Sequence, residues 1–178
     1  GGRTLLPLVL GELRGLVPAA VAQFTWYGSD GQLQNFWSDQ LMPRRLAWIV
    51  LHHRQYEADA GIRFADLVRF GAPTGNLRHL WHEGFGETVT ARAVFAPYRL
   101  KWMLDGVVRD AQRPHGCVLL MRHDDAEDFS ARDEDLLGQV LPWLAHALAC
   151  AQARPQRFVG GGRSALLVCD DDGTVQEW

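Results

Sequence analysis

The first forty residues show one helical pattern of apolar positions followed by two extended patterns. Apolar residues of the first segment recur every three or four positions; they are Leu6, Val9, Leu10, Leu13 and Leu16. This spacing predicts an amphipathic helix that ends before Pro18. Apolar and polar residues then alternate from Ala19 to Tyr27, and turn-forming residues 29–32 precede a second extended stretch, Leu33 to Trp37. The two stretches predict a β-hairpin.

Helical spacing returns in the middle of the chain. Leu46, Ile49 and Val50 repeat at helix spacing and His53 falls on the same stripe, which predicts a helix that runs to about Gly61. Two shorter helical segments are expected around 64–70 and 77–83. Each is followed by a glycine suited to the left-handed conformation of a helix C-terminus, and these are Gly71 and Gly84.

The second half of the chain predicts two strands and a long helix. Apolar and polar residues alternate from Arg99 to Val108, and an apolar run extends from Cys117 to Met121. Both stretches are expected to be strands of one antiparallel sheet. Ser130 is placed to cap a helix with an acidic first turn, which extends to about Ala153. Its apolar seam is spaced four, three and four residues apart and consists of Leu137, Leu141, Leu144 and Leu148.

Composition narrows the class of protein. The 178 residues contain 18 Lys and Arg against 21 Asp and Glu, a net charge of −3, and 47% of them are hydrophobic. These values suit one globular domain and argue against electrostatic binding of nucleic acid by this segment. Apolar runs such as Leu46 to Leu51 are far shorter than the roughly 20 residues that cross a membrane. Three cysteines without paired spacing indicate a reducing, cytoplasmic location.

A segment rich in glycine and proline divides the chain near its end. Residues 153–163 contain Pro155 and the run Gly160 to Gly162, which predicts a linker. The linker would separate a main domain, residues 1–152, from a second segment, residues 164–178. The second segment has the pattern of a strand, a tight turn and another strand, so we expect the sequence to be a piece of a longer protein.

The motifs of the second half are similar to the end of the GAF-type sensor domains of LuxR-type transcriptional regulators. In that family a strand ending in Arg leads to a Phe-Ser-x-x-Asp cap and a helix rich in Leu and Pro. The matching stretches are Gly116 to His123, Asp128 to Leu137 and Leu141 to Leu148. The resemblance covers about Leu5 to Ala151, and residues 165–175 are similar to the connector or PAS-like hairpin that often follows such a sensor.

This resemblance implies an α+β, GAF/PAS-like fold and a sensory role. The fold has a central antiparallel sheet, with the N- and C-terminal helices packed on one face and loops and short helices over the other. The family senses a small molecule or a partner and controls a helix-turn-helix domain. That output domain is absent from this sequence, so any contact with DNA would be made only through it.

In GAF-like folds a ligand pocket lies between the sheet and the segments that cover it, which makes the aromatic residues its first candidates. They are Phe24, Trp26, Phe36, Trp37, Trp81, Phe95 and Trp102. Gln23 and Asn35 would add hydrogen bonds if they face inward. The alternative is a filled core, because an aromatic side chain buries roughly 150–250 Å² without binding anything.

A homodimer is the other predicted assembly. The closing helix and the opening helix would supply its interface through Leu6, Val9, Leu13, Leu137, Leu141, Leu144 and Leu148. Packing of these helices on their own sheet would use part of this surface. The same arrangement is compatible with a ligand-free dimerisation or scaffold module of a signalling protein, which is the main alternative to a sensor.

Signals for catalysis and metal binding are weak. His79 and His82 lie one helical turn apart beside Glu83, but no third ligand of similar quality accompanies them. The four acidic residues of the loop 124–128 lack the pattern of a calcium loop. Cys117 is a candidate for redox chemistry in this fold, but its place inside a strand favours a buried, inert thiol. We therefore predict no catalytic residue, metal or cofactor.

Overall fold

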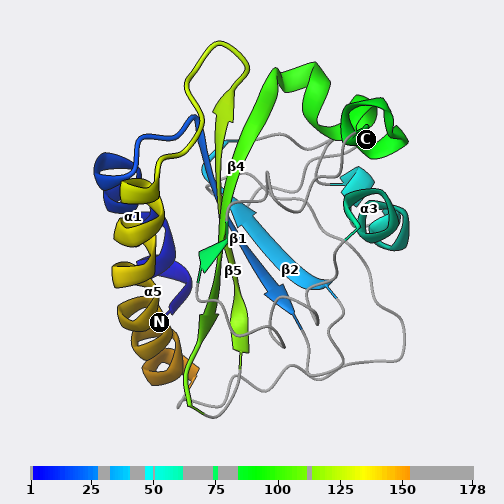
Figure 1. Cartoon of the computed structure of the whole chain (residues 1–178). Helices are drawn as coiled ribbons and strands as arrows, with labels where there is room; N and C mark the ends of the chain where they lie inside the picture. Colours follow the sequence, from blue (N-terminus) through cyan, green and yellow to red (C-terminus); the bar gives the residue numbers. More distant parts are fainter. Residues whose placement is uncertain are drawn as a thin grey trace, which may run out of the picture.

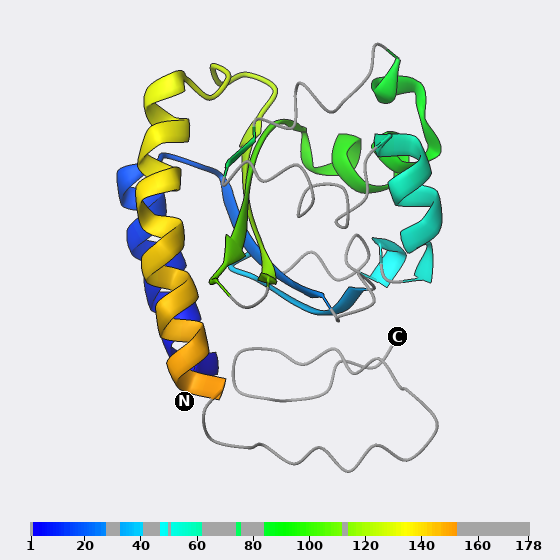
Figure 2. The same ribbon diagram turned by 60° about the horizontal axis from the view of Figure 1, so that its bottom comes forward.

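The computed structural model describes residues 2–27, 33–40, 47–49, 51–61, 74–75, 84–111 and 114–152. An antiparallel sheet lies at the centre, with two long helices on one face and shorter helical segments on the other (Figures 1 and 2). This is the α+β arrangement that the sequence predicted. The predicted linker and second segment, residues 153–178, lie outside the described residues.

The sheet is built from two hairpins that pair through their inner strands. Its strands are β1 (Val21–Tyr27), β2 (Leu33–Ser38), β3 (Thr74–Gly75), β4 (Leu100–Arg109) and β5 (Pro114–His123). Their order is β2-β1-β5-β4-β3, and every pair is antiparallel. The predicted hairpin and both predicted late strands are confirmed. Because β1 and β5 occupy the middle of the sheet, residues on either strand have neighbours on both sides.

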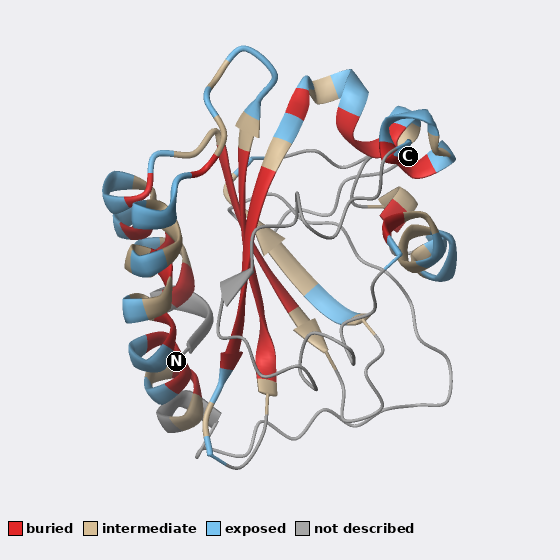
Figure 3. Ribbon diagram, viewed as in Figure 1, coloured by how far each residue is buried: buried red, intermediate tan, exposed pale blue. Residues whose placement is uncertain are grey.

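The helices α1 (Gly2–Leu16) and α5 (Ala131–Gln152) pack side by side on one face of the sheet (Figure 2). Their apolar stripes meet strand residues such as Phe24 and Leu120 in one core, and the stripes appear as buried positions in Figure 3. The buried stripe of α1 continues into Val17 just after the helix, whereas Leu16 is 55% exposed. The prediction for Leu16 was wrong because the buried positions 6, 10, 13 and 17 follow one face of the helix and position 16 lies off it.

The leucines of the seam on α5 pack within the core of the domain. Six of the seven residues predicted for a dimer interface are at most 5% exposed, and they are Leu6, Leu13, Leu137, Leu141, Leu144 and Leu148. Val9 is partly buried against the same core. These side chains already pack on their own sheet, which is the physical reason why they do not offer an intermolecular surface. A homodimer stays a prediction, and α1 and α5 leave Leu8, Leu16 and Trp143 exposed for such a contact.

The opposite face of the sheet is covered by α3 (His53–Ala60) and by short turns between residues 85 and 98. The turns are two 3-10 segments, η2 (Phe85–Glu87) and η4 (Ala96–Tyr98), on either side of the π-helical segment η3 (Ala91–Phe95). The predicted end of α3 at Gly61 is confirmed, since Gly61 is left-handed with φ 70°. Gly84 is also left-handed, with φ 99°.

Several predictions for the middle of the chain differ from the structure or lie outside the described residues. The helical turns after Gly84 were not expected, because segments of three to five residues are too short to show a period. The segments predicted around 64–70 and 77–83 lie outside the described residues. On β4 the alternation suggested one apolar face, but Met103 and Asp105 on the other face are also buried, at 1% and 2% exposed. Both faces of β4 are buried because the sheet is covered on both sides.

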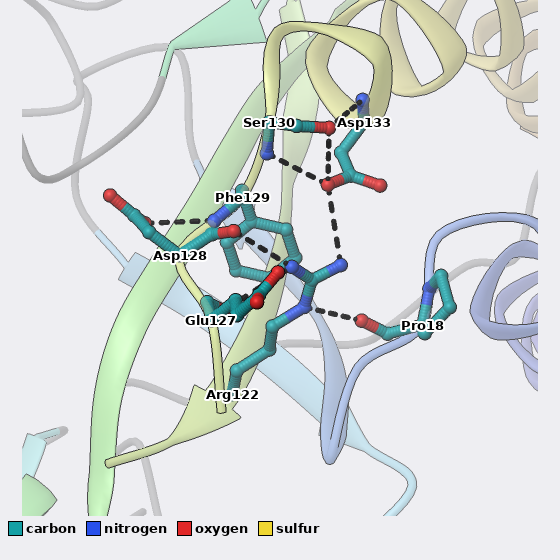
Figure 4. A network of polar contacts seen from close by, with 7 residues as sticks. All are labelled: Pro18, Arg122, Glu127, Asp128, Phe129, Ser130 and Asp133. Carbon is teal, nitrogen blue, oxygen red and sulfur yellow. Dashed lines mark hydrogen bonds and ion pairs between the residues drawn. The ribbon is translucent and has the colours of Figure 1, made fainter. Parts of the chain in front are cut away.

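Near the end of β5, the Arg122 side chain forms hydrogen bonds that link three segments of the chain (Figure 4). Its Nε donates to the carbonyl of Pro18 at 2.7 Å, and Nη1 donates to the carbonyls of Asp128 at 3.0 Å and Glu127 at 3.3 Å. The guanidinium carbon lies 4.0 Å from the ring centre of Phe129. Nη2 donates to Oδ2 of Asp133, on the first turn of α5, at 3.3 Å. Arg122 therefore joins the α1–β1 connection, the sheet and the start of α5.

Ser130 caps the start of α5 as predicted, and the structure adds that the cap is reciprocal. The backbone N–H and the hydroxyl of Ser130 donate to Oδ2 of Asp133 at 2.8 and 2.9 Å, and the N–H of Asp133 donates to Oγ of Ser130 at 3.3 Å. This satisfies backbone donors that a helix N-terminus otherwise leaves unpaired. Burial raises the pKa of Asp133, but the bonds from Ser130 and the charge of Arg122 outweigh it, and the pKa lies below its ordinary value.

Gly116 is required by close packing between β1 and β5. A Cβ at this position would lie 2.2 Å from the carbonyl oxygen of Thr25 and 2.7 Å from the ring of Phe24. We expect Gly116→Ala to lower the free energy of unfolding by about 3 kcal/mol, because overpacked sites force the backbone to move. Urea unfolding followed by circular dichroism measures this change.

Gly11 provides the matched control. It lies inside α1, and a Cβ there would meet nothing within 4 Å. Gly11→Ala should therefore stabilise the domain by about 0.5–1 kcal/mol, the difference in helix propensity. Equal effects of the two substitutions would contradict the packing argument.

Candidate ligand pocket

A cavity lies on the face of the sheet opposite α1 and α5. The cavity volume is about 20 Å³, and the empty space reaches about 420 Å³ when the part open to solvent is counted. The lining comes from β1, β2 and β5 and from the segments over them: Gln23, Thr25, Tyr27, Leu33, Phe36, Ile49, His53, Tyr56, Phe95 and Leu119. The cavity is narrow as it stands, so a ligand larger than a few atoms requires the covering segments to move.

The alternation of β1 decides which side chains reach this cavity. Successive residues of a strand point to opposite faces. Gln23, Thr25 and Tyr27 line the cavity, whereas Ala22 and Phe24 lie in the core beneath α1 and α5. A central strand thus presents three polar side chains in a row to one face.

Three of the predicted pocket residues line the cavity, namely Gln23, Phe36 and Phe95. Phe24, Trp26, Trp37 and Trp102 instead pack in or against the core formed with α1 and α5. Asn35 pairs with Trp26 across the hairpin and is exposed, so it is on that same face. The four aromatic residues were wrongly predicted because ring size was used to choose them, whereas strand parity determines the face. Asn35 was predicted on the condition that it faces inward, and that condition is not met. Trp81 lies outside the described residues.

Four polar lining residues were missed: Thr25, Tyr27, His53 and Tyr56. The signal for the first two was present in the sequence, since they follow Gln23 at intervals of two. The His53 side chain is 11% exposed, and its Nδ1 lies 4.0 Å from Oε2 of Glu57. Burial lowers the pKa of His53, and the nearby Glu57 opposes that change.

One row across the sheet carries three buried oxygen atoms that lack a hydrogen bond. Gln23 pairs with Ser38 on one side and with Leu119 on the other, and Leu119 pairs in turn with Asp105. Paired residues share a face, so all four side chains project toward the cavity side. Gln23 Oε1, Ser38 Oγ and Asp105 Oδ1 are each buried without a partner. The other end of the Gln23 amide donates to Thr25 Oγ1 at 3.2 Å.

Asp105 is the most unusual of these residues. It is 2% exposed, and burial raises the pKa of its carboxyl group from 3.8 to about 7, although its own backbone N–H partly offsets this. Burial, together with the charge of Asp105, also raises the pKa of the Cys117 thiol well above its ordinary value. Burial, together with the nearby Cys117, does the same to the pKa of the Tyr27 hydroxyl. Cys117 is therefore a protonated thiol at neutral pH, which disfavours a nucleophilic role.

The other candidate sites gain no support from the described residues. His79, His82 and Glu83 lie outside that part of the chain. Of the acidic loop, Asp124 and Asp125 bind Arg99, at 2.6 and 3.0 Å. Within the described ranges no cluster of His, Cys, Asp and Glu has the geometry to hold a metal, and no helix there is long and apolar enough to cross a membrane.

Comparisons with known proteins identify the fold. No family model matches the sequence, and no curated protein matches it. Among solved structures, GAF3 from Slr1393 of Synechocystis sp. PCC6803 superposes with a TM-score of 0.60 at 14% identity, covering 86% of this chain and 96% of that one. The VqsR LBD domain from Pseudomonas aeruginosa also gives a TM-score of 0.60, at 17% identity, covering 80% and 82%.

A third solved structure, the GAF domain/HD domain protein from Geobacter sulfurreducens, gives a TM-score of 0.56 at 14% identity, covering 83% of this chain and 92% of that one. Identities this low establish similarity of fold alone. The strand order, the α1–α5 layer and these superpositions agree with one another. The chain has a GAF-like fold.

Proposed function

We propose that this domain is the sensor of a LuxR-type transcriptional regulator, which binds a small molecule in the cavity and thereby controls a DNA-binding output domain. The observation that carries the proposal is the unpaired Oε1 of Gln23, which lines the cavity and lies in one row with unpaired oxygen atoms of Ser38 and Asp105. Two further facts support it. The motif around Arg122 resembles that family, and VqsR, whose domain has the same fold, is a LuxR-type regulator.

The unpaired row favours a ligand over a filled core. A buried polar group without a partner costs about 1–3 kcal/mol, so a domain that needed only a stable core would gain from apolar residues at these positions. A ligand that completes these hydrogen bonds removes the penalty. The ligand-free scaffold interpretation leaves the row unexplained.

The sheet itself offers a route from the cavity to the output. Asp105 lies on the same face as Leu119 and Gln23, with which it is aligned, and its neighbour Gly106 faces α5. A Cβ at Gly106 would lie 2.8 Å from Leu141 Cδ1, so α5 rests directly on the backbone of β4. A ligand that shifts β4 would therefore shift α5. We propose that binding changes the population of two positions of this helix.

A thermal-shift screen of the purified domain against a metabolite library tests the proposal. A ligand at 100 times its dissociation constant should stabilise the domain by about 2.7 kcal/mol. Gln23→Leu should abolish the shift because it removes the amide from the cavity. Trp26→Phe is the matched control, since Trp26 lies on the opposite face of the same strand and should leave the shift unchanged.

Three results are informative. A shift that is lost only in Gln23→Leu supports the cavity as the sensor site. A thermal shift that both variants retain would mean that the ligand binds elsewhere, and it would contradict the proposed binding site. A flat screen favours the scaffold interpretation. Control of DNA is tested on the full-length protein, whose affinity for its operator should change by at least several-fold when the ligand is added.

A further inference from the structure

Two of the described residues that line the cavity have a buried polar atom without a hydrogen bond. They are Gln23, through Oε1, and His53, through Nδ1. The amide oxygen of Gln23 can only accept, so its partner must be an N–H or O–H group. Burial lowers the pKa of His53, so its ring is neutral near pH 7, and either nitrogen of a neutral imidazole can be the donor or the acceptor. Gln23 therefore sets the stricter requirement: the ligand must carry a hydrogen-bond donor.

The amide of Gln23 is held in place with its oxygen unpaired. Gln23 is 5% exposed on the central strand β1, and its Nε2 donates to Oγ1 of Thr25, a second lining residue, at 3.2 Å. A buried acceptor without a partner is costly, and a donor on a ligand removes that cost. A site of this kind rejects analogues that lack the donor, because they leave its polar group unpaired. We therefore expect the cavity to discriminate between ligands of equal shape with and without a donor.

Aromatic rings supply much of the remaining described lining. The residues that carry them are Tyr27, Phe36, His53, Tyr56 and Phe95. The ring centre of His53 lies 6.1 Å from that of Tyr27 and 6.4 Å from that of Tyr56, and both pairs are tilted. Tilted and edge-on contacts over 4.5–7 Å are the ones that aromatic rings favour. An aromatic ligand can make the same contacts with this wall.

The size of the cavity limits the ligand to about one ring. Its volume of about 20 Å³ holds little more than one water molecule, whereas the empty space with its open part reaches about 420 Å³. Benzene occupies an apolar protein cavity of about 150 Å³, which lies between these two values. A single ring thus requires only a partial displacement of the cover, to which α3 contributes His53 and Tyr56 and η3 contributes Phe95.

We propose that the cavity binds a small aromatic molecule with one ring and a hydrogen-bond donor, of the phenol or aniline class. The donor pairs with Oε1 of Gln23, and the ring packs against the aromatic lining. The inference rests on the proposed sensory function and specifies its ligand class. A ring without a donor leaves Gln23 unpaired, and an aliphatic ring loses the aromatic contacts.

Calorimetric titration of the purified 178-residue chain with matched probes tests the ligand class. Phenol and aniline carry both features. Toluene has nearly the same shape without a donor, and cyclohexanol has a hydroxyl donor on an aliphatic ring. Phenol or aniline should bind at least ten times more tightly than both toluene and cyclohexanol. Equal binding of phenol, aniline and toluene, tighter binding of cyclohexanol, or no binding of phenol and aniline overturns the inference.

Two variants assign the preference to its residue. Gln23→Leu removes the acceptor, so toluene should bind to it at least as tightly as phenol does. Binding of toluene and a native circular dichroism spectrum show that the cavity of this variant still forms. Gln139→Leu makes the same substitution at an exposed position of α5 and should keep the wild-type preference for phenol. A preference for phenol that Gln23→Leu retains overturns the inference.

The outcomes also separate this inference from the sensory proposal. A library ligand that lacks a ring or a donor, and whose binding is lost in Gln23→Leu, would overturn the ligand class and leave the sensor function standing. Phenol binding that leaves the affinity of the full-length protein for its operator unchanged would support the site and contradict the sensor function. Absence of binding by every probe and by the wider library would contradict both.

Discussion

Asp105→Asn should remove a large pH dependence of stability. In the wild-type domain the carboxyl pKa rises from 3.8 to about 7 on folding, so the folded state holds a proton that the unfolded state releases. The stabilisation of the folded state by the protonated carboxyl group is fully present below about pH 4 and is lost as the pH rises through 7. The loss amounts to about 4 kcal/mol, the free-energy equivalent of that change in pKa.

Urea unfolding of both proteins from pH 4 to pH 8 measures this contribution. The difference in unfolding free energy between wild type and Asp105→Asn should change steadily across the interval in favour of the variant. The comparison cancels other acids, such as Asp133, whose lowered pKa acts in the opposite direction at lower pH. Parallel profiles would show that the Asp105 carboxyl group is hydrated or paired in solution.

Arg122→Ala should lower the free energy of unfolding by about 3–5 kcal/mol at pH 7. The Arg122 and Asp133 side chains are 13% and 14% exposed, so the substitution leaves the largely buried carboxylate of Asp133 without its ion pair, with only the bonds from Ser130 remaining. It also leaves three backbone carbonyls without the Arg122 donor. Chemical denaturation followed by tryptophan fluorescence measures the loss.

Two further variants test the geometry of this network. Arg122→Lys keeps the charge but lacks the planar fork of donors, so it should lie between Ala and wild type. Arg132→Ala removes an exposed arginine from the same first turn of α5 and should change stability by less than about 0.5 kcal/mol. A loss in Arg122→Lys equal to that in Arg122→Ala would mean that the hydrogen bonds, and not the charge, carry the whole effect. Equal losses in Arg122→Ala and Arg132→Ala would contradict the network.

The sequence alone determined most of the elements that carry the fold. The spacing of Leu137 to Leu148 predicted α5, and the Ser130 to Asp133 cap predicted where that helix begins. Alternation predicted the strands, and the residues around Arg122 indicated the GAF-like fold. All of these signals are local: one turn of helix, a cap or a two-residue period is written in neighbouring residues.

The candidate site was only partly predictable. Gln23, Phe36 and Phe95 were expected at the cavity and lie there, whereas Trp26 and Trp102 were expected and do not. Alternation divides a strand into two faces, but it does not say which face a helix covers. Choosing residues by ring size therefore mixed the two faces.

Only the tertiary structure decided how distant residues meet. Arg122 binds the carbonyl of Pro18, 104 residues earlier in the chain, and the row of Ser38, Gln23 and Asp105 exists only because β2, β1, β5 and β4 align in one register. A leucine seam serves a core or a dimer with the same spacing, and packing on the sheet assigned it to the core. Local chemistry thus determined the elements, whereas burial and pairing between segments far apart in sequence decided what each element faces.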